Sequence, residues 1–214
     1  MARARYVVIG GLVVGSAAMG FLVGDRNGPL RDATAQAAQA GKAEASSPEL
    51  IAEGQRIFRF DTFGDEQLWT DTLRMHEVVE KNVDPTTALA VGLKVDSDVL
   101  PPGLLQKVDL KDPATTVALL KLNAVVGLKA TVDENNHITQ LGVTCALCHS
   151  TVDDSVMPGI GRRLDGWPNR TLDVGKIIAL SPALPAEKKA VYNSWGPGKY
   201  DPRFNIDGKN TPLV

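Results

Sequence analysis

Cysteines, aromatic residues and an excess of positive charge are all scarce in this sequence. The chain of 214 residues has two cysteines, which are too few for a disulfide framework. Aromatic residues make up 5%, so the sequence does not indicate a platform for stacking RNA bases. The formal net charge of −2 argues against general nucleic-acid binding, because that function needs a basic surface. We therefore expect no nucleic-acid partner.

The remaining composition is that of a soluble globular protein. Hydrophobic residues make up 43% and charged residues 22%, which excludes a disordered acidic or basic protein and a polytopic membrane protein. The sequence contains no glycine-rich phosphate-binding loop and no nucleotide-binding fingerprint. It also has no serine, cysteine or paired-carboxylate pattern typical of a hydrolase.

The N-terminal segment has the pattern of an export signal. Arg3 and Arg5 precede the uncharged run 6–24, which as a helix would span roughly 28 Å, close to a hydrocarbon core of about 30 Å. Residues 1–27 are therefore a signal peptide or a membrane anchor, followed by an Ala/Gln-rich linker over 28–48. Both alternatives predict export. The rest of the chain would lie on the periplasmic side of the inner membrane, anchored by residues 6–24, or in the periplasm after cleavage.

Residues 49–214 are expected to form one domain that is mainly α. The order Ser47-Pro48-Glu49 is typical of a helix start. Elsewhere, apolar residues recur at spacings of three and four, which indicates further helices. A polar turn at 134–136 between two apolar stretches predicts a β-hairpin. The expected helices cover 48–58, 65–81, 112–123, 171–180 and 185–194, and the expected hairpin strands cover 125–132 and 137–143.

Both cysteines lie in the pentapeptide Cys145-Ala146-Leu147-Cys148-His149, which is the attachment signature of a c-type haem. Thiols three positions apart lie about one helical turn apart and can reach the two vinyl groups of one haem, while the next residue offers its imidazole to the iron. A structural zinc site is the weaker alternative, since it needs four ligands and therefore the convergence of His76 or His137. A thioredoxin-type dithiol needs a surrounding βαβ pattern, which the sequence does not show. The prediction is one covalent haem c.

Three further patterns accompany this pentapeptide, namely Gly54-x-x-x-Phe58, Pro158-Gly159-x-Gly161 and Leu164-x-Gly166. With them the chain resembles a class I c-type cytochrome domain, and more loosely the exported cytochromes related to di-haem peroxidases. The resemblance covers about 49–60 and 142–196. It implies a cytochrome c-like helical fold that wraps the porphyrin, with an insertion at about 61–141 that includes the hairpin. It also implies that a carbonyl in the Pro158 segment accepts the His149 N–H.

The sequence departs from that family in its single attachment motif. A di-haem peroxidase carries two such motifs, so we expect a monohaem protein and a C-terminally truncated relative of that group. The sixth iron ligand stays open among His76, Met75, Met157 and none. Met157 follows His149 by only a short loop, while His76 lies in an apolar helical setting.

Basic residues after the motif are candidates for the haem propionates. Arg162 and Arg163 suit carboxylates, and Trp167 could pack on a propionate or hydrogen-bond to it. The leading interpretation is a carrier of single electrons that serves a redox partner protein. The alternative is a haem peroxidase or oxygenase with an open distal side, where His76 or Glu77 would handle protons. A third interpretation is a haem subunit or sensor that docks on a larger complex through the insertion.

Overall fold

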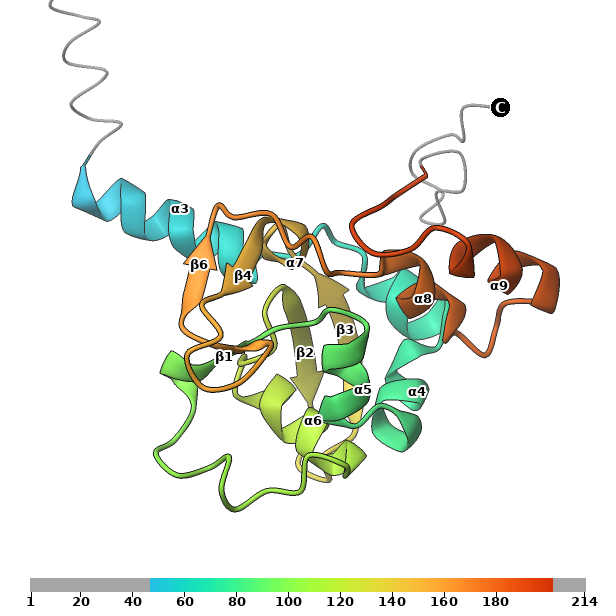
Figure 1. Cartoon of the computed structure of the whole chain (residues 1–214), viewed down its shortest axis with the longest axis horizontal. Coiled ribbons are helices and arrows are strands. Elements are labelled where there is room, and N and C mark those ends of the chain that lie inside the picture. Colours follow the sequence, from blue (N-terminus) through green and yellow to red (C-terminus); the bar gives the residue numbers. More distant parts are fainter. Residues whose placement is uncertain (1–46, 202–214) are drawn as a thin grey trace, which may run out of the picture. The chain divides into compact units, whose positions relative to one another are not determined.

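A computed structural model gives the arrangement of the chain and describes residues 47–201 (Figure 1). The boundary between its two units falls after Gly54, inside helix α3 (Pro48–Phe60), and the description below concerns the second unit. The predicted anchor at 6–24 and nearly all of the linker at 28–48 lie outside the described residues. Within 47–201, no helix is long and apolar enough to cross a membrane.

The predicted first helix is confirmed as α3, but the predicted helix over 65–81 is wrong. It is split into the π-helical turn η1 (Leu68–Thr72) and helix α4 (Met75–Asn82). Arg74 separates them with a φ of 54°, a left-handed conformation that no α-helix continues through. Its guanidinium donates to Glu77 at 2.7 and 2.9 Å, which fixes the start of α4.

Two short helices begin at an Asp-Pro pair. The Asp84 carboxylate accepts the Thr87 N–H at 2.7 Å and caps α5 (Pro85–Ala90), which the sequence analysis missed. The Asp112 carboxylate accepts the Ala114 N–H at 2.9 Å and caps α6 (Pro113–Lys121), as predicted. In both helices the proline occupies the first turn, where its missing N–H costs no hydrogen bond.

The predicted hairpin is confirmed as the antiparallel pair β2 (Leu128–Val132) and β3 (Ile138–Val143). It lies at the centre of the unit, where α4 packs on β3 and α6 packs on β2 (Figure 1). The main core forms between these elements, with the buried side chains of Leu73, Met75, Val79, Val95, Val117, Leu119, Leu120, Ala124, Val125, Ile138, Leu141 and Ile160.

Four further short strands follow from contacts that are distant in sequence. β1 (Val95–Asp96) pairs in parallel with β5 (Ile160–Gly161), and β4 (Ser150–Val152) pairs antiparallel with β6 (Arg163–Asp165). The sequence analysis predicted none of them, because strands of two or three residues have no detectable alternation. The pairing of β4 with β6 is the more important for function, since β4 begins directly after His149.

The last two helices form a pair at the C-terminal end of the described chain. Helix α8 (Val174–Ala179) packs against α9 (Ala186–Asn193), and both lie within the predicted ranges (Figure 1). The buried Asp173 carboxylate accepts the Lys176 N–H at 3.0 Å and so caps α8 three residues later than predicted. Helix α8 also contributes Val174 and Ile177 to the cluster beneath the pentapeptide motif.

Candidate functional site

The pentapeptide motif forms the short helix α7 (Ala146–His149), and its helical spacing sorts its side chains into two sets. Ala146 is fully buried and Leu147 is 8% exposed, whereas Cys148 and His149 are exposed and Cys145 is half-buried. Positions i, i+3 and i+4 share one face of a helix, so the two thiols and the imidazole lie on the same outward face. Both cysteines are free thiols.

The Cys148 thiol is affected by its surroundings and by the neighbouring cysteine. Although the residue is exposed at the surface, partial burial of its sulfur and the negative charge of a Cys145 thiolate raise the pKa of the Cys148 thiol above its ordinary value. Both effects disfavour the Cys148 thiolate, so this residue is a protonated thiol at neutral pH. The His149 imidazole makes no hydrogen bond or ion pair with any described residue, which leaves both ring nitrogens available to a ligand.

The inward face of α7 is fixed by packing. Ala146 lies in a cluster with Val126 and Val152, against which Phe58 packs, and Leu147 lies in another with Val78 and Leu172. Gly127 lies so close to α7 that a Cβ there would come 2.1 Å from the Leu147 Cα. The motif helix therefore rests directly on the backbone that enters the hairpin.

A turn at 166–169 is hydrogen-bonded to the last carbonyls of the motif. The Gly166 N–H donates to the His149 carbonyl at 2.8 Å, and the Asn169 N–H donates to the Cys148 carbonyl at 2.9 Å. The buried Asn169 side chain donates to the Gly92 carbonyl at 2.9 Å and so fixes the turn to the body of the unit. These bonds hold Trp167 beside the motif, although its side chain is 64% exposed.

A second exposed aromatic residue lies in a segment bonded to the strand that precedes the motif. The Phe63 N–H donates to the Val143 carbonyl at 3.1 Å, two residues before Cys145, and Phe63 is 62% exposed. Two large exposed aromatic residues in segments that are hydrogen-bonded to the motif or next to it are a notable feature of this surface. The sequence analysis missed Phe63, because its Asp-Thr-Phe-Gly-Asp context indicated only a turn.

The two arginines predicted to meet the propionates differ in exposure. Arg162 is exposed, and its Nε lies 4.0 Å from the Asp153 carboxylate. The Arg163 side chain is only 3% exposed, and its Nε lies 3.1 Å from the Asp165 carboxylate in an ion pair. Burial lowers the pKa of Arg163, although its charge is partly compensated by Asp165. Arg163 is thus a buried ion-pair partner of Asp165, although its Nε and Nη2 make no hydrogen bond in the described part of the chain, and Arg162 is the arginine whose side chain reaches solvent.

The predicted contact between His149 and the Pro158 segment is not formed among residues 47–201. Pro158 lies in a tight turn in which the Ile160 N–H donates to the Met157 carbonyl at 2.8 Å. The next carbonyl, that of Gly159, accepts the Val95 N–H at 2.9 Å. Met157 is 37% exposed in this turn.

The candidates for a sixth iron ligand have different environments. Met75 is 3% exposed and lies inside the main core, where its sulfur is enclosed by other apolar side chains. His76 is half-buried, and its Nδ1 is a buried atom without a hydrogen-bond partner in the described part of the chain. His137 is exposed, and its Nδ1 lies 3.5 Å from the Glu80 carboxylate.

The zinc alternative finds no support in the geometry. Across residues 47–201, no group of three or more His, Cys, Asp or Glu side chains is placed to hold a metal ion. His76 and His137 therefore do not converge with the two cysteines. A haem makes a different demand, because its iron takes one imidazole from the motif and four nitrogens from the porphyrin.

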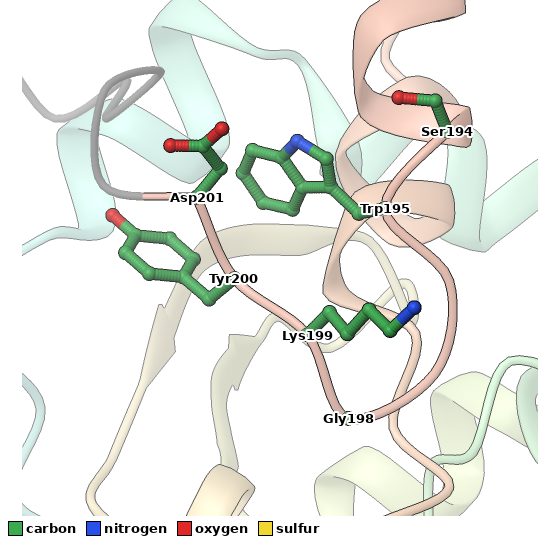
Figure 2. Close-up of a pocket in the computed structure, with 6 residues that line it drawn as sticks. All are labelled: Ser194, Trp195, Gly198, Lys199, Tyr200 and Asp201. Atoms are coloured by element: carbon green, nitrogen blue, oxygen red, sulfur yellow. The ribbon is translucent and has the colours of Figure 1, made fainter.

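Two surface pockets are lined by residues outside the pentapeptide. One, of about 590 Å³, is lined by six residues near the C-terminal end of the described chain, where Trp195, Tyr200 and Asp201 surround an open hollow (Figure 2). Trp195 makes edge-on ring contacts with Tyr192 and Tyr200 at 5.2 and 5.3 Å. The other, of about 400 Å³, includes Glu80 and His137. None of the other predicted site residues lines either pocket.

The residues around α7 fit a covalently bound haem. Both thiols are free, the His149 imidazole is exposed with no partner among residues 47–201, and the exposed aromatic residues Trp167 and Phe63 lie in segments hydrogen-bonded to the motif or to the strand before it. No protein-family model, curated protein or solved structure matches this chain. The functional argument therefore depends on the motif and on the geometry around it.

Proposed function

We propose that this protein binds one haem c covalently at Cys145 and Cys148 and transfers single electrons to or from a partner protein. The observation that carries the proposal is the shared outward face of Cys145, Cys148 and His149, fixed by packing on its inner side. Each thiol would add across one vinyl double bond. A carbon–sulfur bond forms and the thiol hydrogen passes to the other vinyl carbon, so the attachment needs no oxidant.

The surrounding residues would orient and shield the group. His149 would supply an axial imidazole, since neither of its ring nitrogens is engaged by another described residue. Trp167 and Phe63 would cover the porphyrin edges, which would account for the exposure of both side chains in the haem-free chain. Arg162 is the residue available to pair with a propionate. When bound, haem supplies an iron that cycles between two oxidation states, and its environment sets the potential.

The compartment and the partner belong to the same proposal. The export signal predicted at 1–27 places the haem domain on the periplasmic side of the inner membrane, anchored or released after cleavage. His76 is the candidate for the sixth ligand that the proposal retains, because its Nδ1 lacks a partner among the described residues. An electron carrier needs a redox partner protein but no substrate pocket.

The peroxidase alternative finds less support, because one of its two candidates for handling protons, Glu77, is already engaged. The Glu77 carboxylate accepts two hydrogen bonds from Arg74 and lies 3.9 Å from Lys81. The hydrogen bond from Arg74 lowers the pKa of Glu77, so this residue is an ionised partner rather than a proton donor at neutral pH.

The proposal is tested by expressing the full chain in a host that matures c-type cytochromes. The pyridine haemochrome spectrum should be that of a haem with two thioether links, and Cys148→Ser should change it to that of a single link. A low-spin ferric spectrum supports the carrier, whereas a high-spin spectrum with reactivity toward peroxide supports the enzyme. Replacement of His76 with Ala should convert low-spin iron to high-spin if His76 is the sixth ligand.

A further inference from the structure

One residue of α3, Arg59, is connected to both ends of the pentapeptide motif. Its carbonyl oxygen accepts the hydroxyl of Thr144 at 3.2 Å, directly before Cys145. Its guanidinium Nε donates to Asp165 Oδ2 at 2.6 Å. The Asp165 carboxylate in turn accepts the hydroxyl of Ser150 at 2.8 Å, directly after His149.

The two hydroxyl residues that flank the motif have no access to solvent. Thr144 is 1% exposed and Ser150 is fully buried, so neither hydroxyl can replace its partner with water. Ser150 also begins β4, which pairs with β6, and the residue after β6 is Gly166, whose N–H binds the His149 carbonyl. Two hydrogen bonds therefore hold the backbone around His149. One joins the Ser150 hydroxyl to Asp165, and the other joins the Gly166 N–H to the His149 carbonyl.

The Asp165 carboxylate interacts with side chains from three elements. Gln55 and Arg59 of α3 donate to Oδ2 at 3.3 and 2.6 Å, while Ser150 of β4 donates to Oδ1. Arg163 of β6 places its Nε 3.1 Å from Oδ1, and its side chain is 3% exposed. Two guanidinium groups thus interact with one carboxylate, Arg59 through a hydrogen bond and Arg163 through an ion pair. A charge-assisted hydrogen bond such as that of Arg59 is about twice as strong as a neutral one.

We propose that Arg59 and Asp165 form a clamp that positions the imidazole of His149 for axial ligation. This inference rests on the proposed function, because it assigns positioning residues for the haem ligand. The orientation of an imidazole follows from the backbone that carries it, and the clamp fixes that backbone on both sides. Neither residue touches the haem, so both act through Thr144, Ser150 and Gly166.

The test compares Arg59→Gln and Ser150→Ala with Asp61→Asn in the full chain. The control breaks an ion pair at the end of α3, between Arg56 and Asp61 at 2.9 Å, whose side chains are about half exposed. Amide exchange at Gly166 needs no haem and reports the bond to the His149 carbonyl. It should rise about tenfold in both clamp variants and stay unchanged in the control.

A second readout uses the haem-loaded chain. The pH at which acid displaces His149 from the iron, followed by absorption, should rise in Arg59→Gln and Ser150→Ala and should be partly restored in Arg59→Lys. Unchanged Gly166 exchange and an unchanged acid transition in both variants would overturn the clamp. If Arg59→Gln does not fold, Ser150→Ala decides, because it keeps the arginine pairs. Absence of haem from the wild type would instead overturn the proposed function, and the exchange measurement would still test the clamp.

Discussion

The amide nitrogen of Gly166 lies 2.8 Å from the carbonyl oxygen of His149. Through this bond the turn that carries Trp167 is fixed beside the residue that we propose as an iron ligand. Helix α7 has only four residues, so its last carbonyls cannot be satisfied within the helix. The turn satisfies two of them, and it carries the exposed Trp167.

The close approach of Gly127 to α7 predicts a large effect of a single methyl group. Gly127→Ala should lower the free energy of unfolding by about 3 kcal/mol, because the Cβ meets the Leu147 backbone and φ is 80°. Gly103→Ala is the matched control. Its φ is 75°, but its Cβ meets only the Gln106 side chain at 3.8 Å. Urea unfolding of both variants measures the difference, and equal losses would show that Gly127 is not tightly packed.

The reaction of the Cys148 thiol with iodoacetamide in the haem-free chain should have a pH profile shifted upward. The pKa of Cys148 is raised by burial and by Cys145, so its alkylation rate should still be rising above pH 8.5, the ordinary thiol pKa being about that value. In Cys145→Ser the midpoint for Cys148 should move down, because one of the two causes is removed. Peptide mass spectrometry after timed alkylation gives the profile. A midpoint at or below the ordinary value would contradict the described environment.

The Asp165 carboxylate should stabilise the fold in a pH-dependent way. Burial alone raises the pKa of Asp165, but the hydrogen bonds from Arg59 and Ser150 and the two arginine charges outweigh it and lower the pKa. A lowered pKa in the folded state gives stabilisation that is complete above the unfolded value of about 3.9 and is lost as the pH falls through the folded value.

Asp165→Asn should therefore lower the free energy of unfolding by about 2 kcal/mol at pH 7, with part of the loss coming from Arg163, whose charge is left without its carboxylate. The difference from the wild type should shrink as the pH falls below about 3.9, because the unfolded chain then binds a proton at Asp165 that the native carboxylate does not yet bind. Urea unfolding from pH 7 to pH 3 measures it. A difference that stays constant over this range would contradict the ionised carboxylate.

Trp167 should matter only when haem is present. In the haem-free chain Trp167→Ala should change the free energy of unfolding by about 0.5 kcal/mol or less, because the side chain is 64% exposed. Trp195→Ala should cost about 3 kcal/mol, since Trp195 is 8% exposed. In the haem-loaded chain Trp167→Ala should become clearly destabilising by thermal unfolding. An equal effect with and without haem would show that Trp167 does not contact the haem.

Local signals in the sequence were enough for several elements. Proline after a capping residue predicted the start of α3, the spacing of apolar residues predicted α6, and the polar turn predicted the hairpin, because these preferences act within a few residues. The break at Arg74 could not be predicted, because a left-handed arginine has no local signal. The outward face of Cys145, Cys148 and His149 follows from helical spacing, which the sequence does contain.

The surroundings of that face depend on contacts between distant segments. The bonds of Asp165 to Arg59 and of Phe63 to Val143 join residues that are far apart along the chain. The inward position of Arg163 also follows from the pairing of β4 with β6, which are too short to show a pattern. A single sequence contains no record of such pairings, so the clamp and the second exposed aromatic residue emerge only from the fold.

The central claim is tested most directly by the intact mass of the full chain produced in a host that ligates haem. The account predicts one added haem that survives denaturation, and its loss in the double variant Cys145→Ser, Cys148→Ser. The same wild-type protein should resist alkylation at both cysteines. A wild-type chain with no added mass and two thiols that react with iodoacetamide would contradict the account.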